Sequence, residues 1–246
     1  GGNLKIIAHI LPNILFQHSE DSAFLWGIRN SAIYEPHYKL FNLAKLDDRI
    51  EAHIDGLRIA GDKGWKICEE ALAWENPGEV FCAAALAFES RIEERIQTVL
   101  EMVGDNYDLS RGLISALGWI PFEIIESRTL DLTKEESPAL RRIGLAAHCV
   151  HRKDPGQLLI DALSDSDAAL KAYALKAVGE LGRNDLVSNV VAHFSDEDEK
   201  CRFFAAWSAG LLGNTSSISV LQNIVENTDA HQEKACAMAL RNMSLP

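Results

Sequence analysis

Long apolar runs are absent from this 246-residue sequence, and no stretch approaches the ~18 uninterrupted apolar residues of a membrane span. Positive charge is in the minority, with 24 Lys and Arg against 36 Asp and Glu and a formal net charge of −12. This balance argues against broad electrostatic binding to nucleic acid or to anionic membranes. A hydrophobic content of 47% excludes disorder. We therefore expect a folded, cytoplasmic protein that binds neither nucleic acid nor membrane.

Cysteine pairs are also missing. The five cysteines are odd in number, and none belongs to a C-x-x-C pair. Each lies among Ala, Leu and Phe in helix-like segments, where free cysteine behaves as a small buried hydrophobe. A disulfide framework is not expected at this size and spacing. The predicted core cysteines of a reducing compartment are Cys68, Cys82, Cys149, Cys201 and Cys236.

An internal repeat of about 31 residues organises most of the chain. Residues 167–182 align with residues 198–213 after a shift of 31, and copies begin near residues 47, 77, 107, 138, 167, 198 and 229. A fixed period of this length is typical of stacked repeat proteins. The coincident pairs are Asp167/Asp198, Lys171/Arg202, Ala174/Ala205, Gly179/Gly210, Leu181/Leu212 and Gly182/Gly213.

Each copy predicts two helices. The first half is rich in Ala and carries apolar residues at helical spacing, whereas the second half is a shorter apolar segment. Asp167 and Asp198 stand where a helix N-cap belongs, and Gly182 and Gly213 stand where a helix ends. Strand patterns are absent. Because neither helix can bury its apolar face alone, the pairs must stack, and the sequence predicts an all-α, right-handed α-α superhelix.

The repeat resembles the short bacterial HEAT-like repeats that also occur in relatives of phycobilisome lyases. The likeness rests on Asp-x-Asp at 165–167 and 196–198, on Ala-Ala within the helix, on Leu-Gly at its end, and on one cation per copy. It covers about residues 47–243 and implies a HEAT-like solenoid. It also leaves bilin lyase activity open, although no residue marks a tetrapyrrole site. The cations are Arg111, Arg142, Lys171 and Arg202.

These cations have two interpretations. We favour a structural one, in which each cation reaches the Asp that opens a neighbouring repeat, so that ion pairs form a ladder along the stack. The alternative is a row of cations that binds an anionic ligand. Because Asp and Glu crowd the same turns, the ladder is the prediction.

Residues 1–46 are predicted to form an N-terminal helical cap, and residues 47–246 the HEAT-like repeats. Residues 18–74 resemble the N-terminal part of an uncharacterised bacterial family of HEAT-repeat proteins, some of which are encoded with type VI secretion systems. We expect irregular helices here, with Trp26 and Tyr38 over the first repeat, Arg29 and Arg49 paired with carboxylates, and a break at Pro12.

The same region gathers polar side chains that bear on function. Their spacings match no metal-ligand motif, so structural hydrogen bonding or surface exposure is favoured, and a metal or acid/base site remains the alternative. An enzyme or small-ligand binder that uses this His/Asp/Trp cluster is therefore the second hypothesis for function. The residues concerned are His18, Glu20, His37, Asp48, His53 and Asp55.

Enzyme motifs are otherwise lacking. No glycine-rich phosphate loop occurs, and none of the eight His is followed by Glu, as di-iron hydroxylases of HEAT architecture require. HEAT-like DNA glycosylases need a basic groove lined by aromatic side chains, which the negative charge opposes. We predict a protein that is not an enzyme and has no cofactor, metal or catalytic residues.

The leading hypothesis is a scaffold that binds another protein. Second helices usually line the concave face of such a solenoid, and the repeat register turns small, mostly neutral polar residues outward there. The last copy, residues 229–242, lacks its second helix, so we expect either a continuation of the chain beyond it or an open end that docks on something. The predicted partner-binding residues are Gln157, Asp161, Ser188, Ser219 and Asn223 of the second helices, and Trp26, His37 and Tyr38 of the cap.

Overall fold

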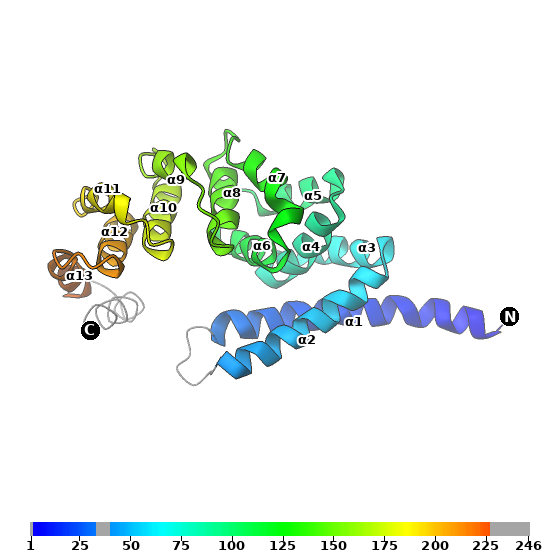
Figure 1. Cartoon of the computed structure of the whole chain (residues 1–246). Coiled ribbons are helices and arrows are strands. Elements are labelled where there is room, and N and C mark those ends of the chain that lie inside the picture. The colour runs from blue at the N-terminus through cyan, green and yellow to red at the C-terminus, as the bar shows by residue number, and fades with distance from the viewer. Residues whose placement is uncertain (1, 33–39, 227–246) are drawn as a thin grey trace. The chain divides into compact units, whose positions relative to one another are not determined.

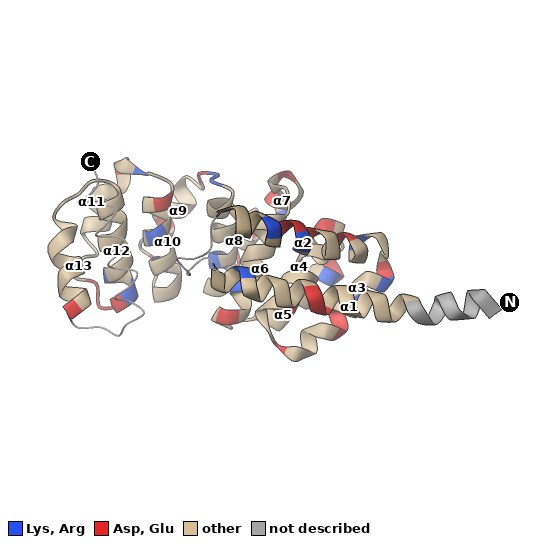
Figure 2. Ribbon diagram, turned by 90° about the horizontal axis from the view of Figure 1, so that it is seen from below, with Lys and Arg blue, Asp and Glu red and all other residues tan. Residues whose placement is uncertain are grey.

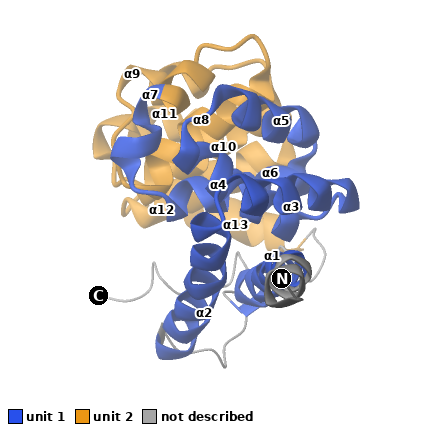
Figure 3. Ribbon diagram, turned by 90° about the vertical axis from the view of Figure 1, so that its right-hand side faces the viewer, with its two compact units in different colours: residues 1–127 blue, residues 128–246 orange. Residues whose placement is uncertain are grey.

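A computed structural model describes residues 2–32 and 40–226 (Figure 1). Helices connected by short turns make up these residues, and no strand occurs among them. The predicted all-α fold class is therefore confirmed. The chain divides into two compact units, residues 1–127 and residues 128–246 (Figure 3). Within the described ranges, no helix combines the length and the apolarity that crossing a bilayer requires.

Unit 1 begins with two long helices that lie side by side, followed by shorter helices (Figure 1). Helix α4 packs against α1, α2, α3, α5 and α6, so every residue from Val80 to Phe88 is buried. The elements are α1 (Gly2–Ala32), α2 (Leu40–Ile59), α3 (Asp62–Ala71), the 3-10 helix η1 (Leu72–Trp74), α4 (Pro77–Ser90), α5 (Glu93–Val103), α6 (Tyr107–Trp119) and the first half of α7 (Phe122–Leu132).

A close helix contact holds α4 against α6. A Cβ atom added to Gly112 of α6 would lie 2.0 Å from the carbonyl oxygen of Pro77, far inside van der Waals contact. No other residue type fits at this position without separating the two helices. The spacing of these helices therefore depends on a glycine that the sequence pattern did not single out.

Helix α1 continues through Pro12, so the predicted break at this residue is wrong. Proline removes one backbone donor and clashes with the preceding turn, which weakens or bends a helix without always ending it. The side chains of α1 that lie C-terminal to Pro12 and face the core, from Leu15 to Trp26, are held by burial in unit 1.

Unit 2 consists of successive helix pairs. The first helices α8, α10 and α12 pack side by side, whereas the shorter α9 packs against α10, and α11 and α13 both pack against α12 (Figure 1). The core that these helices share is built mainly of Leu, Ala, Val and Cys. The elements are the rest of α7, α8 (Pro138–Val150), α9 (Gln157–Ala162), α10 (Ala168–Glu180), the 3-10 helix η2 (Asn184–Leu186), α11 (Val187–Val191), α12 (Glu199–Leu211) and α13 (Ser217–Glu226).

Side chains cap the first helices at their N-termini. Asp167 accepts a hydrogen bond from the N–H of Leu170 at 2.8 Å, and Asp198 accepts one from the N–H of Cys201 at 2.9 Å. Both predicted N-caps are thus confirmed. Ser137 and Asn106 cap α8 and α6 in the same way, so one local signal, a short polar side chain before the helix, sets the start of four helices.

Left-handed residues end the first helices of unit 2. Gly182 and Gly213 have φ values of +68° and +81°. After α10, the N–H groups of Gly182 and Arg183 bond back to the last turn at 3.2 and 3.0 Å, which is the Schellman arrangement. The predicted glycine ends are confirmed. After α8 the equivalent left-handed residue is Arg152, at φ +52°, where a side chain is unfavourable.

Five helices begin within one residue of predicted copy starts. The predicted start at 47 falls inside α2, which runs across the proposed boundary between residues 46 and 47. The start at 229 lies outside the described residues. The division into a cap and repeats stays a prediction, whereas the compact units divide after Ser127. The five matching first residues are Pro77, Tyr107, Pro138, Ala168 and Glu199.

Candidate functional site

The second helices of unit 2 present a surface that we call the polar band. All five residues predicted on these helices are exposed, and the structure adds Asn189 and Gln222 beside them. The sequence analysis missed these two because it considered only one position of each repeat and the position one helical turn later. The polar band comprises Gln157, Asp161, Ser188, Asn189, Ser219, Gln222 and Asn223.

The polar band is almost uncharged. Helix α11 contains no acidic or basic residue, and α13 contains one, Glu226 at its end (Figure 2). On α9, the Asp161 carboxylate accepts a hydrogen bond from the Gln157 amide at 2.8 Å. This neutrality stands out in a chain of which 24% is charged, and it suits recognition by shape and hydrogen bonds.

A pocket of about 370 Å³ adjoins the polar band between α12 and α13. Its lining combines apolar side chains with the charged Glu199 and Arg202 of α12. Two predicted partner-binding residues, Ser219 and Asn223, line the pocket as well. Its described lining residues are Phe194, Glu199, Arg202, Ser219, Val220, Asn223 and Ile224.

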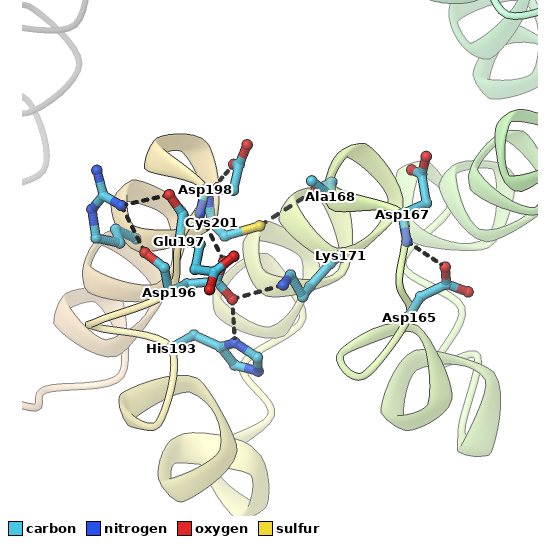
Figure 4. A network of polar contacts seen from close by, with 10 residues as sticks. Asp165, Asp167, Ala168, Lys171, His193, Asp196, Glu197, Asp198 and Cys201 are labelled. Carbon is cyan, nitrogen blue, oxygen red and sulfur yellow. Dashed lines mark hydrogen bonds and ion pairs between the residues drawn. The ribbon is translucent and has the colours of Figure 1, made fainter.

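An ion pair joins consecutive repeats of unit 2 at Asp196 (Figure 4). The Asp196 carboxylate accepts hydrogen bonds from Lys171 Nζ of α10 at 2.8 Å and from His193 Nδ1 at 2.9 Å. Its other oxygen accepts the backbone N–H of Asp198 at 3.0 Å, immediately before α12. One buried carboxylate therefore fixes the turn, orients the N-cap of α12 and ties α12 to α10.

The preceding repeat makes the same connection. Arg141 of α8 donates to the Asp165 carboxylate at 3.0 Å, and Asp165 accepts the N–H of Asp167 at 2.8 Å. Lys171 does reach the next repeat, but its partner is Asp196, two residues before the opening Asp198 that was predicted. The assignment of Arg142 to the ladder is wrong, because Arg141 makes the contact in α8. The N-cap of α8 is Ser137, so the cation four residues later is Arg141, and Arg142 lies one position further round the helix and is buried.

The two outer cations of the predicted ladder behave differently. Arg111 of α6 lies 4.0 Å from Asp108 of its own helix. Arg202, four residues after its N-cap like Lys171, donates to the backbone carbonyls of Asp196 and Glu197 at 2.6 and 2.9 Å. The start of the following repeat lies outside the described residues.

The environment of Asp196 favours its charged form. Burial opposes ionisation, but the hydrogen bonds from Lys171, the Asp198 N–H and His193 outweigh it and lower the pKa of Asp196 to about 2. The hydrogen bond to Asp196 raises the pKa of Lys171. Burial and nearby carboxylates raise the pKa of Cys201 to about 12. That thiol stays protonated at neutral pH, so it does not supply an activated nucleophile to the network. The network therefore has a structural role.

The structure brings together two of the six polar residues singled out near the N-terminus. Nδ1 of His18 lies 2.9 Å from Nδ1 of His53. Asp55 bonds to Arg58 at 2.7 Å, and Glu20 and Asp48 are exposed. His37 and Tyr38 lie outside the described residues. No group of three His, Cys, Asp or Glu side chains is arranged for a metal ion within the part of the chain that the structure describes.

Trp26 is a core residue, which corrects its prediction as a partner contact. Its side chain is 4% exposed and stacks on Phe81 of α4, with ring centres 6.0 Å apart. Its indole N–H donates to Ser115 of α6 at 2.9 Å, and Phe81 meets Trp119 edge-on at 5.5 Å. The aromatic side chain joins α1, α4 and α6, so it is not available to a partner.

Ionic contacts hold α2 in unit 1. Arg58 binds the Glu89 carboxylate of α4 with two bonds, at 2.7 and 2.6 Å, and also binds Glu51 and Asp55. Burial opposes the charge of Arg58, but these carboxylates raise its pKa. Sequence reasoning missed the pair with Glu89, although its separation of 31 residues equals one repeat. The predicted pairing of Arg29 with a carboxylate is confirmed, since it binds Asp47.

The cysteines occupy the predicted core positions wherever they are described. Cys68, Cys82, Cys149 and Cys201 are buried free thiols. Burial raises the pKa of Cys68 to about 12. Cys236 lies outside the described residues. The core prediction therefore holds for the four cysteines that the structure describes.

Comparison with known protein families adds one finding. Residues 156–241 match the family model described as HEAT repeats. This segment carries HEAT repeats. It begins just before α9 and takes in α10 to α13, so it contains the polar band and the Lys171–Asp196 ion pair. A search of curated proteins finds no match.

Proposed function

We propose that this protein is a non-enzymatic scaffold that binds another protein through the polar band of unit 2. The observation that supports the proposal most is the almost uncharged polar surface that repeats on α9, α11 and α13. Neutral polar groups lose less free energy than charged groups when they leave water, so such a surface suits a protein interface. Stacked helical repeats commonly supply extended binding surfaces of this kind.

The HEAT-repeat match covers the same helices, which supports an interaction role. The resemblance of residues 18–74 to a bacterial HEAT-repeat family, some members of which are encoded with type VI secretion systems, supports the same class of function and names no partner. Among the described residues of the N-terminal cluster, His18 and His53 are the pair that meets, and Trp26 is buried. No specific observation favours a second function there.

Site-specific photo-cross-linking tests the proposal. A cross-linking amino acid at Ser188 or Ser219, both exposed on the polar band, is expected to capture the same partner from cells of the source organism. The control position is Ala169, which is exposed on the first helix α10. Equal capture from Ala169 and from the polar band would contradict the proposal.

Charge insertion provides the quantitative test with the captured partner. The double variant Ser188→Arg, Ser219→Arg is expected to weaken binding at least about tenfold, because it places two hydrated charges in an interface without counter-charges. Ala169→Arg is the matched control and should leave affinity unchanged. Circular dichroism establishes that both variants remain folded. Unchanged affinity in the double variant would contradict the assignment of the polar band as the binding surface.

A further inference from the structure

Two histidines face each other between the first two helices of unit 1. Nδ1 of His18 on α1 and Nδ1 of His53 on α2 are 2.9 Å apart, and the ring centres are 5.2 Å apart. The difference between these distances is about the width of one imidazole ring, so both nitrogens lie near the line that joins the ring centres. One ring therefore points its N–H directly at the lone pair of the other.

This arrangement accepts a limited number of protons. An N–H···N bond needs one protonated and one unprotonated Nδ1. The bond exists when both rings are neutral, and it strengthens when one of them becomes a cation. When both rings are cations, two N–H groups and two positive charges face each other at 2.9 Å. The contact then becomes repulsive, and the two titrations are coupled.

The surroundings hold the two rings in this position. A Cβ atom on Gly56 of α2 would lie 2.8 Å from His18 Cδ2 and Nε2. The ring of His18 therefore packs against α2 at a position where glycine has no side chain. Burial lowers the pKa of His53, the Asp21 carboxylate of α1 opposes this effect, and the charges of His18 and Arg49 of α2 reinforce it.

Helices α3 and α4 pack against the same part of α1. Cys68 of α3 donates to Ser19 of α1, and Cys82 of α4 shares a hydrogen bond with Ser22 of α1. Burial raises the pKa of both thiols, so they remain uncharged at neutral and acidic pH. The Glu79 carboxylate interacts with Glu20 of α1. The charges that act directly on the imidazole of His53 are those of Asp21, His18 and Arg49.

We propose that His18 and His53 form an acid-sensitive contact that holds α1 against α2 with one shared proton and loosens when both rings are protonated. The stabilisation is present above the ordinary histidine pKa of about 6.5 and is lost as pH falls below it, because the unfolded state then binds more protons than the folded state. The Ser19 and Ser22 contacts to Cys68 and Cys82 lie on the same part of α1, so they loosen with it.

Two measurements on the full chain test this proposal. In an NMR titration, the two rings are expected to titrate in two steps at least one pH unit apart, with the shared proton observed between them. In hydrogen exchange corrected for intrinsic rates, the opening equilibrium constant of α1 and α2 is expected to be at least about tenfold larger at pH 5 than at pH 7. His53→Gln, which stays neutral, should abolish that difference.

A variant outside this contact provides the control. His151→Gln changes a half-buried histidine of unit 2 and should retain the full difference in opening between pH 5 and pH 7. Independent ring titrations within half a pH unit of each other would overturn the proposal. Equal opening of α1 and α2 at both pH values in the wild-type protein, or a pH dependence that persists in His53→Gln, would overturn it as well.

Discussion

The ion pair at Asp196 gives the sharpest stability prediction. The Asp196 side chain is 8% exposed and accepts hydrogen bonds from Lys171, His193 and the N–H of Asp198. Asp196→Asn keeps the shape and one acceptor oxygen but removes the charge. We expect this variant to loosen the connection between α10 and α12 without changing the fold.

The magnitude follows from the pKa of the carboxyl group. A pKa lowered from 3.8 to about 2 corresponds to about 2.4 kcal/mol in favour of the charged form, at ~1.36 kcal/mol per pH unit. The raised pKa of Lys171 reports the same interaction, so it contributes no further free energy. The free energy of unfolding should therefore fall by about 2 kcal/mol, more than the ~0.2–1 kcal/mol of an exposed ion pair.

Urea denaturation followed by circular dichroism measures this loss across pH. The pKa of Asp196 is lower in the folded protein than in the unfolded chain, so its stabilisation is complete above about pH 5 and is lost as pH falls toward 2. The difference between wild type and variant should shrink to about half by pH 3. Asp185→Asn changes an exposed carboxylate that pairs with Arg183 and should leave the midpoint unchanged. A difference below about 0.5 kcal/mol at pH 7, or one that does not change with pH, would refute the reasoning.

Three further predictions test the packing and the repeat register. Gly112→Ala should cost about 3 kcal/mol in thermal unfolding, because its Cβ would lie 2.0 Å from a carbonyl oxygen of α4. Gly27→Ala, which meets nothing within 4 Å, should instead stabilise α1 by ~0.5–1 kcal/mol. Arg152→Gly should raise the melting temperature, because it removes a side chain from a backbone position in the left-handed region at φ +52°. A lower melting temperature would contradict this. Asn227, outside the described residues, stands where the two preceding repeats have the aspartate of the ion pair; Asn227→Asp should stabilise the protein by ~0.5–1 kcal/mol, and Arg202→Met should cancel the gain.

Local features of unit 2 were predictable because they depend on neighbouring residues. A short polar side chain at an N-cap or a glycine at a helix end acts within a few residues, so Asp167, Asp198, Gly182 and Gly213 lie where the pattern predicts. The ladder was predictable in kind but not in every residue. An error of one position moves a side chain about 100° around a helix, which is why Arg142 was chosen in place of its neighbour.

Contacts of unit 1 were harder to predict because they join helices far apart in sequence. The His18–His53 pair and the Arg58–Glu89 pair depend on how α1, α2 and α4 cross, and no repeat pattern specifies those crossings. An aromatic residue near a terminus suits either a surface or a core, so the burial of Trp26 could not be deduced from its position. The exposure of the second-helix residues was predictable because the repeat register fixes which helix face is apolar.

Hydrogen exchange with the captured partner tests the binding proposal most directly. The complex and the free protein are compared at one pH, segment by segment. The account predicts slower exchange in the complex at α9, α11 and α13, the helices that carry the polar band, with no change in α10. Slower exchange confined to unit 1, or to the first helices of unit 2, would contradict it.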